Sequence, residues 1–487
     1  MKTKRFTILH SNDMHGDFLA EVRQGSGKLI GGLALLSGYV KKVRAEEENV
    51  LYMIAGDMVQ GSLIDSEYKG VSTMEIMNML SPDVVALGNH ELDYGLPHLL
   101  FLEKVATFPI VNANLFIRKY MRRLMRPYII LQKAGLDILV TGIITEKIMD
   151  TLRQDNLIGS FVTLEEASQA IGAICNAYKH DDIDLTIVLT HIGLESDIQL
   201  ASMLDPDWGV DMIIGGHSHS VMDAPLRVNN ILIAQAGVGT NQIGRFDITV
   251  DDDTNAIVDY AWQLVEIQEG IAEPDAEMLA MIEQYKTLVD AKYGAILCMF
   301  TRPLSHPRRE VETELGNLFA DIFAENAECD VMLLGSGSIR SESLGPAVTL
   351  GSLRACFPFD DKILRGTLSG DQLWRLFSHI MRPENRTGEG ECYQVNRGVE
   401  AVYDDGARRL VSLKVRGQPV QANALYRVAL QAYHYSNCRQ YLDIQPEELS
   451  QAAGLKVVST SAQQVLEEYL RTHQNLSAKV EGRLVYV

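Results

Sequence analysis

The chain has too few basic residues to hold a polyanion by charge. Its 487 residues include 44 Lys and Arg against 64 Asp and Glu, and the formal net charge at pH 7 is -20. Binding of DNA or RNA depends on many Lys and Arg side chains that displace counterions from phosphates, and that surplus is missing here. We therefore expect no nucleic acid polymer as a partner. A small anion stays possible, because a local pair of Arg side chains or metal ions can hold one phosphate.

Cysteines are few and long apolar runs are absent. The six cysteines are scattered and form no C-x-x-C pair: Cys175, Cys298, Cys329, Cys356, Cys392 and Cys438. Dispersed thiols are typical of buried residues in a reducing compartment rather than of a disulfide framework. No apolar run approaches the roughly 18 residues of a membrane helix, and Phe6 to Leu9 is too short for the apolar region of a signal peptide. We expect a cytoplasmic protein without a membrane partner.

Length and apolar content predict two domains. The chain is longer than one core usually supports, and 46% of its residues are hydrophobic. Strand and helix patterns alternate through residues 1–265, as in a layered α/β domain. An acidic stretch and a helical pattern at 266–295 predict a connector, and 296–487 has strands and helices of its own. We find no internal repeat or low-complexity segment.

Five polar clusters in the first domain each follow a short apolar run. The most informative is Gly88 to Gly95, which follows Val84 to Leu87. In it Asp93 lies three residues after His90, an offset that lets the carboxylate fold back and orient the imidazole. The other clusters are Asn12 to Gly16, Gly56 to Gly61, Thr190 to His191 and Gly215 to His219. Such clusters meet at the carboxyl edge of an α/β sheet, so they predict a shared site.

The residue types in these clusters fit metal ions. Together the clusters supply two carboxylates, one amide and four imidazoles. Mixed nitrogen and oxygen donors suit Zn²⁺, Mn²⁺, Fe or Co better than Ca²⁺ or Mg²⁺ alone. So many donors exceed what one ion needs, which predicts two divalent ions that share a bridging carboxylate. Taken singly, Asp13 could be a turn former and His191 a core histidine, but five such loops together favour the metal site.

The ordered motifs resemble a known family. Asp-x-His-Gly, Gly-Asp-x-x-Gln-Gly-Ser, Gly-Asn-His-Glu-Leu-Asp, Thr-His and Gly-Gly-His-Ser-His are similar to those of the calcineurin-like metallophosphoesterases. Their order, and a second domain of this length, resemble the 5′-nucleotidase family, which includes UDP-sugar hydrolases and 2′,3′-cyclic-nucleotide phosphodiesterases. The resemblance covers nearly the whole chain. It implies an α/β fold in which a four-layer αββα domain is followed by a smaller α+β C-terminal domain.

The resemblance also implies roles for the cluster residues. It assigns one ion to Asp13, His15, Asp57 and His219, and the other to Asp57, Asn89, His191 and His217. Asp57 would bridge the two ions. His90 would act on the phosphoryl or leaving-group oxygen, with Asp93 fixing its tautomer. Hydroxide formed from water at the two ions would then attack phosphorus directly, without a phosphoenzyme.

The second domain carries residues that resemble the family's substrate side. Arg340 ends the loop Gly335 to Arg340, similar to the family's Asn-Gly-Gly-Gly-Ile-Arg, and Arg309 resembles a further phosphate-facing Arg. Phe359 and Tyr433 match the two aromatic residues that enclose a base. Each also has an ordinary alternative, a surface ion pair for the Arg residues and core packing for the aromatic ones. Arg439 stands where the family has a carboxylate for ribose.

These observations predict metal-dependent hydrolysis of a phosphate ester, with a nucleoside 5′-monophosphate or related nucleotide as the small-molecule substrate. A 2′,3′-cyclic-nucleotide phosphodiesterase and a UDP-sugar hydrolase are the alternatives within the enzyme class. A nucleotide-binding sensor with weak turnover is the alternative outside it. The complete His90 and Asp93 pair argues against the sensor, because a binding module has no evident need for an acid-base pair. The sequence leaves the oligomeric state open.

Overall fold

The structure is a computed structural model that describes residues 3–23, 25, 27–117, 122–144, 163–179, 181–251, 253–386, 391–450 and 454–487. The chain divides into two compact units, Met1–Val289 and Asp290–Val487. The division falls inside one helix, α8 (Ala276–Tyr293). Among the described residues, no helix combines the length and the apolar character that a bilayer crossing requires.

The first unit contains two six-stranded sheets. One has the order β16-β15-β1-β4-β5-β6, formed by Ala256–Glu266, Gln242–Asp251, Thr3–Ser11, Val50–Ala55, Val84–Ala86 and Ile110–Val111. The other has the order β13-β14-β12-β11-β10-β9, formed by Leu226–Val228, Ile231–Ala234, Met212–Ile214, Leu185–His191, Leu136–Ile144 and Tyr128–Lys133. Strands β1, β4, β5 and β6 run parallel, as do β10, β11, β12 and β14. Their carboxyl ends therefore lie at one edge of each sheet.

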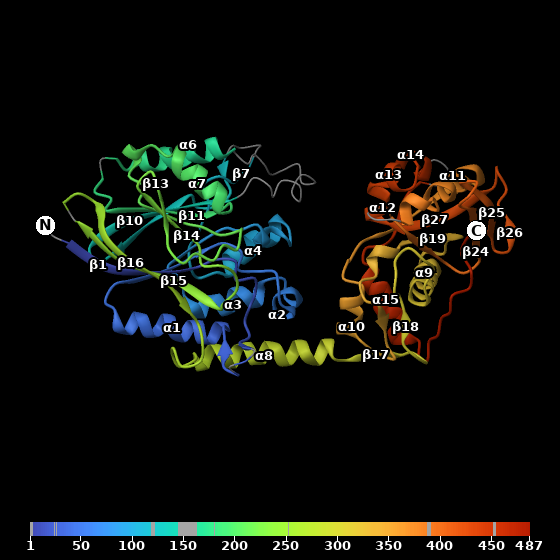
Figure 1. The fold of residues 1–487 in the computed structure, drawn as a ribbon, viewed down its shortest axis with the longest axis horizontal. Helices are drawn as coiled ribbons and strands as arrows, with labels where there is room; N and C mark the ends of the chain where they lie inside the picture. The colour runs from blue at the N-terminus through green and yellow to red at the C-terminus, as the bar shows by residue number, and fades with distance from the viewer. Residues whose placement is uncertain are drawn as a thin grey trace. The chain divides into compact units, whose positions relative to one another are not determined.

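The two sheets pack face to face and helices cover their outer faces. One buried cluster joins side chains of both sheets, among them Ile8, Met53, Val140 and Ile187. A second cluster packs α6 (Leu164–Ala177) and α7 (Leu194–Met203) on the outside of the β11 sheet. In Figure 1, α1 (Leu33–Glu46) and α3 (Val71–Leu80) cover the opposite face. The predicted four-layer αββα arrangement is confirmed.

Local sequence explains several boundaries in this unit. The strand Val50–Ala55 is buried along its whole length, as its unbroken apolar run predicts for a central parallel strand. Helix α6 begins where Thr163 accepts a hydrogen bond from the Glu166 backbone N–H and Glu166 accepts one from Thr163 in return. This capping box satisfies two otherwise unpaired donors.

The segment from 266 to 289, predicted as part of the connector, packs on the first unit. Asp275 accepts a hydrogen bond from Ser37 at 2.7 Å and pairs with Lys41 at the same distance. Further along α8, Tyr285 donates a hydrogen bond to Glu75, and its ring lies edge-on to Tyr68 with centroids 5.0 Å apart. These contacts hold the first part of α8 against α1 and α3.

The second unit is a separate α+β domain. Its five-stranded sheet has the order β23-β19-β27-β22-β28, formed by Tyr393–Val395, Val331–Gly335, Leu425–Gln431, Ile363–Ser369 and Lys456–Ser459. A four-stranded sheet has the order β26-β25-β24-β29, formed by Gln418–Pro419, Arg409–Val415, Val399–Asp404 and Leu484–Tyr486. Its main helices are α9 (Glu314–Ala327), α10 (Leu350–Cys356), α11 (Gly370–Ile380) and α15 (Ala462–Thr472).

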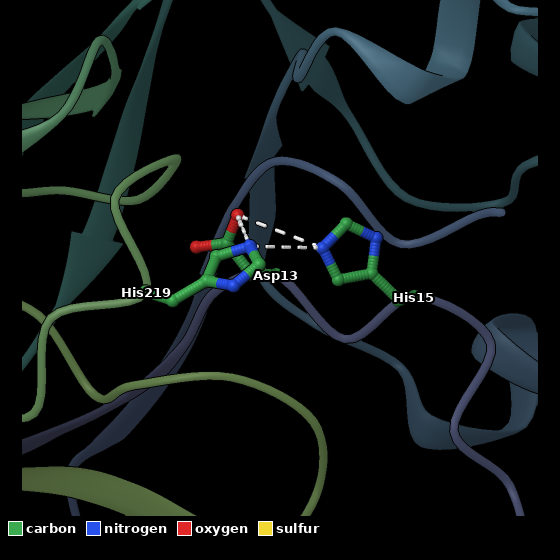
Figure 2. Close-up of side chains that lie close together, drawn as sticks. All are labelled: Asp13, His15 and His219. Carbon is green, nitrogen blue, oxygen red and sulfur yellow. Dashed lines mark hydrogen bonds and ion pairs between the residues drawn. The ribbon is translucent and has the colours of Figure 1, made fainter. Parts of the chain in front are cut away.

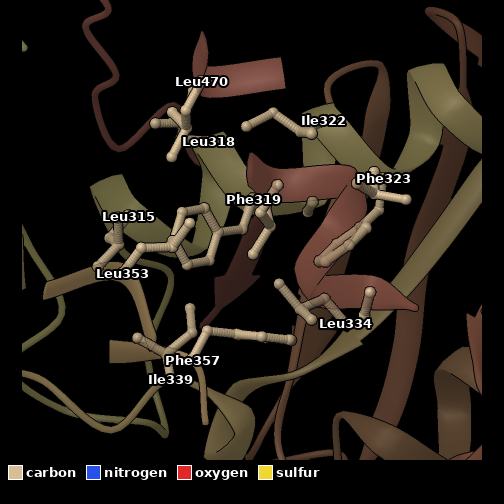
Figure 3. Close-up of a cluster of buried hydrophobic side chains, with 14 of the residues drawn as sticks. Leu315, Leu318, Phe319, Ile322, Phe323, Leu334, Ile339, Leu353, Phe357 and Leu470 are labelled. Atoms are coloured by element: carbon tan, nitrogen blue, oxygen red, sulfur yellow. The ribbon is translucent and has the colours of Figure 1, made fainter. Parts of the chain in front are cut away.

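Helices cover both faces of the five-stranded sheet. On one face α9, α10 and α15 contribute to a core in which Phe357 packs against Phe319 and Phe323, with ring centroids 5.9 and 5.8 Å apart (Figure 3). On the other face α11 packs through Leu373, Leu376 and Phe377. All six cysteines are buried and form no disulfide, as their scattered positions predict.

Candidate metal centre

The five predicted clusters meet at the carboxyl ends of the two central sheets of the first unit. Strands β1, β4 and β5 lead into the loops of Asp13, Asp57 and Asn89, while His191 ends β11 and His217 follows β12. Five of the predicted ligands have left-handed backbone conformations, with φ angles from 48° to 81°: Asp13, His15, Asp57, His217 and His219. Such conformations cost free energy in residues other than glycine and cluster at functional sites. The fold therefore holds these side chains in place at a cost in conformational free energy.

Two glycines let the loops approach each other. A Cβ atom on Gly88 would lie 2.3 Å from Oδ1 of Asp57, and one on Gly56 would lie 2.6 Å from Nδ1 of His191. Both distances are far below van der Waals contact. Any larger residue would push the carboxylate or the imidazole out of position, so the predicted motifs need glycine at these positions.

Asp13, His15 and His219 form the first group of possible ligands (Figure 2). The Nε2 atoms of the two histidines lie 3.2 Å apart, and Oδ1 of Asp13 lies 3.4 Å from Nε2 of His219 and 3.9 Å from Nε2 of His15. Asp13 is fully buried, whereas the imidazoles are partly exposed. Two ring nitrogens that converge on one buried carboxylate oxygen are arranged as donors around a cation.

Asp57, His191 and His217 form a second group. Nδ1 of His191 donates to the backbone oxygen of Ala55 at 2.8 Å, so in the neutral ring Nε2 carries a lone pair. That lone pair faces Oδ2 of Asp57 at 2.9 Å, and Nε2 has no donor to satisfy it. Burial lowers the pKa of His191, but the carboxylates of Asp57 and Asp13 outweigh it and raise the pKa to about 9. The ring must gain a proton or share a cation with Asp57.

The remaining predicted ligands join these groups. Oδ1 of Asn89 lies 2.8 Å from Nδ1 of His217. The His217 backbone N–H donates to Asp13 at 2.9 Å, and Nε2 of His191 lies 3.8 Å from Oδ1 of Asp13. The structure thus brings all seven predicted ligands together. Asp57 belongs to two groups of possible ligands, the second of which contains His15 and His90.

His90 and Asp93 form the expected pair beside this cluster. Nδ1 of His90 lies 2.6 Å from Oδ2 of Asp93, which leaves Nε2 directed to the site at 4.0 Å from Oδ2 of Asp57. The hydrogen bond to Asp93 raises the pKa of His90 above its ordinary value, against the opposing effect of burial. His90 is about one third exposed, so a ligand in the site can reach it.

The donor set fits divalent cations. Mixed imidazole, carboxylate and amide ligands suit Zn²⁺, Mn²⁺, Fe or Co, and the orphaned Nε2 atom of His191 needs a positive partner. A divalent ion held by these residues would supply Lewis acidity, lowering the pKa of a water molecule and neutralising phosphate charge.

Two supporting residues were missed by the sequence reasoning. Asn12 donates to Oδ2 of Asp13 at 2.6 Å and to the Gly237 backbone oxygen at 2.7 Å, which orients the carboxylate. Asp197 accepts from Thr190 and Gln235 at 2.6 and 2.9 Å beneath the loops, and burial raises its pKa to about 7. The position of Asn12 beside Asp13 was a usable signal. Asp197 lies in a sequence pattern typical of an ordinary helix, so its supporting role could not be predicted from the sequence.

In the second unit, Arg340 and Phe359 lie together. The Arg340 guanidinium stands 5.2 Å from the centroid of the Phe359 ring. Phe359 is 46% exposed and Tyr433 is 52% exposed, so neither is packed in the core. Burial raises the pKa of Glu391, and the positive charges of Arg309 and Arg340 oppose that rise.

Arg439 shows a different environment. Its guanidinium lies 3.8 Å from the carboxylate of Glu447, and both side chains are largely exposed. The ring of Tyr433 lies near those of His434 and Tyr441, with centroids 5.2 and 6.2 Å away. Its role in substrate choice stays a prediction.

Comparison with known proteins agrees with this geometry. The calcineurin-like phosphoesterase family matches residues 6–221, and the C-terminal domain of 5′-nucleotidases matches residues 294–443. The chain is 27% identical to a 5′-nucleotidase of Rattus norvegicus over 544 aligned positions, which cover 100% of this chain and 91% of the rat protein. It is 26% identical to Protein UshA of Yersinia enterocolitica, covering 100% of this chain and 94% of that protein.

A solved structure shares the fold across both units. The 5′-nucleotidase precursor of Thermus thermophilus aligns with a TM-score of 0.60 and 23% identity, covering 99% of each chain. The converging imidazoles and carboxylates, set in a double-sheet domain, define a metallophosphoesterase, a hydrolase that acts on phosphoric ester bonds. With its matching second domain, the chain belongs to the 5′-nucleotidase family of these enzymes, and the predicted family is confirmed.

Proposed function

We propose that the protein hydrolyses nucleoside 5′-monophosphates at the centre in the first unit. The observation that carries this proposal is the convergence of seven nitrogen and oxygen donors beside the His90 and Asp93 pair. Relatives described as 5′-nucleotidases align over nearly the whole chain, which supports a nucleotide as the substrate.

We propose that the centre holds two divalent ions of the Zn, Mn, Fe or Co type. Asp13, His15, Asp57 and His219 would hold one ion, and Asp57, Asn89, His191 and His217 the other. The support is geometric, because Asp57 belongs to two groups and Asp13 also lies within 3.8 Å of His191. Two ions bridged by one carboxylate are a common arrangement for displacement at phosphorus.

The protein's own residues have distinct tasks in this reaction. His90 presents Nε2 to the phosphoryl group or to the leaving oxygen, because Nδ1 is engaged by Asp93. A proton on Nε2 can stabilise negative charge on that oxygen as the ester bond breaks. Asp93 keeps the ring in the orientation and tautomer that this role requires. Water is the attacking group, so no phosphoenzyme forms.

In the second unit, the substrate would be bound by Arg309, Arg340, Phe359 and Tyr433. The two guanidiniums would bind phosphate through paired hydrogen bonds. The rings of Phe359 and Tyr433 are exposed, which suits stacking on a base. Arg439 would replace the family's ribose-binding carboxylate with a group of opposite charge.

A phosphate-release panel tests the proposal. Nucleoside monophosphates, 2′,3′-cyclic nucleotides, UDP-sugars, sugar phosphates and a generic aryl phosphate are compared with each of several metals. We expect metal-dependent release with the highest kcat/KM for a nucleoside 5′-monophosphate. A clear preference for cyclic nucleotides or UDP-sugars would replace this substrate with one of the alternatives. Absence of release from every substrate, including the aryl phosphate, would favour a sensor.

The cytoplasmic location is also a proposal. It is supported by six buried cysteines that form no disulfide, which suits a reducing compartment. Fractionation of the source cells, with activity assayed in each fraction, tests it directly. Activity found outside the cytoplasmic fraction would contradict it.

A further inference from the structure

Glu91 is a fully buried carboxylate that the proposed reaction does not use. Only 1% of its surface is exposed. Oε1 accepts hydrogen bonds from the backbone N–H of Met58 at 2.7 Å and, at a longer 3.4 Å, of Val59. Oε2 accepts from the backbone N–H of Gly88 at 2.8 Å and of Asp57 at 3.1 Å. One side chain therefore binds the loops that follow two neighbouring strands, β4 and β5.

The two loops hold each other in a reciprocal way. The backbone N–H of His90 donates to Oδ1 of Asp57 at 2.8 Å, while the backbone N–H of Asp57 donates to Glu91. Each loop thus donates a backbone N–H to a carboxylate of the other loop. The close approach of Gly88 to Asp57 completes this contact. A shift of either loop would move the carboxylate of Asp57 relative to Asn89 and His90.

We propose that Glu91 is a positioning residue that places Asp57 for metal binding before any ion arrives. The inference rests on the proposed role of Asp57 as a metal ligand. An ionised carboxylate has only acceptors, and both oxygens of Glu91 are used to hold backbone donors. Preorganised ligands need not be ordered when the ion binds, so the loss of this contact should weaken metal affinity.

The simplest alternative is that Glu91 only stabilises the fold. In that case its replacement would lower the unfolding temperature while the folded protein bound metal as before. Positioning predicts a different result, because the metal dissociation constant of the folded protein itself would rise. Metal affinity therefore separates the two roles, whereas stability alone does not.

The test is Glu91→Gln, which keeps the size of the side chain. Its amide group exchanges one acceptor for a donor, so an N–H of at least one loop would face another N–H. We expect metal affinity, measured by competition with a chelating dye, to fall about 10- to 100-fold, as for other groups that orient ligands. Glu91→Asp keeps the charge but shortens the side chain, so we expect its metal affinity to stay below that of the wild type.

Asp211→Asn is the matched control. Asp211 also accepts a backbone N–H, that of Thr186 at 2.8 Å, but it precedes β12 at the end of the sheet away from the metal centre. This variant should bind metal as the wild type does. A metal affinity within about twofold of the wild type in Glu91→Gln would overturn the inference. Wild-type metal affinity in Glu91→Asp would overturn it as well.

A second measurement covers the case in which Glu91→Gln fails to fold. In the metal-free wild type, the amides of Met58 and Gly88 should exchange slowly with deuterium, because Glu91 already holds them. Fast exchange that becomes slow only after metal is added would overturn the inference. Neither test uses substrate. Wild-type protein that binds no divalent ion would instead refute the proposed function.

Discussion

Replacing His90 with alanine separates catalysis from metal binding. His90 belongs to one group of possible ligands with His15 and Asp57, yet its Nδ1 atom is engaged by Asp93 and its Nε2 atom lies 4.0 Å from Asp57. If His90 serves the phosphoryl group, His90→Ala should keep its metal and lose turnover. General acid-base assistance is typically worth a factor of about 10²–10⁴ in rate, so we expect kcat to fall by that amount.

The effect of Asp93 follows from its contact with His90. A hydrogen bond to a charged group contributes about 1.5–3 kcal/mol, and about 1.4 kcal/mol corresponds to a factor of ten. Asp93→Asn should therefore lower kcat about ten- to hundredfold, with metal content unchanged. Because Asp93 acts through the His90 ring, the double variant should be no slower than His90→Ala alone.

The assay combines metal analysis with steady-state kinetics on the same samples. Wild type, the two single variants and the double variant are each measured for bound metal per chain and for kcat at saturating substrate. Asn89→Ala serves as the comparison, since Asn89 is assigned to an ion and its loss should reduce bound metal. Loss of metal in His90→Ala but not in Asn89→Ala would refute the assignment. Fully additive effects of the two substitutions would refute the coupling.

Three other predictions concern metal content, substrate choice and pH. Metal analysis should find close to two ions per chain, and Asp57→Asn should weaken the binding of both; a saturated protein with one ion would contradict this. Ribo- and 2′-deoxyribonucleoside monophosphates should give similar kcat/KM values. More anionic substrates should give a higher kcat/KM, and this gain should disappear in Arg439→Asp. A strong preference for ribose that is unchanged in that variant would show that Arg439 does not take part in substrate binding. Burial raises the pKa of Asp211 to about 7 from an ordinary 3.8, so the native state retains a proton that the unfolded chain has lost. The contribution of Asp211 to the free energy of unfolding should therefore fall as pH rises from 4 to 7, so urea titrations over this range should show less loss of stability, or more gain, in Asp211→Asn than in the wild type.

The candidate ligands could be predicted from the sequence, but some of the residues that hold them in place could not. Asp57 and Asn89 stand in motifs that directly follow apolar strands, so topology brings them together once the strands are parallel. Asp197 lies within a helix pattern, and only the tertiary fold brings it under Thr190. Phe357 and Phe359 look alike in sequence, yet one is in the core and the other is exposed, because the turn after α10 decides which ring points inward.

The boundary between the two units could not be predicted from the sequence pattern. The helical pattern from Met278 to Tyr293 has no break, and α8 is continuous across the division at Val289. Packing of Asp275 and Tyr285 on the first unit depends on distant partners, Lys41 and Glu75. A local pattern contains no information about such partners.

The left-handed backbone at five predicted ligand positions limits how this centre can evolve. Among residues other than glycine, Asn, Asp and His enter that conformation most readily, and Asp and His are the residues found there. Replacement by a longer or branched donor would add backbone strain to any change in coordination. Exchange of one ligand for another within this small group is therefore accessible by single mutations.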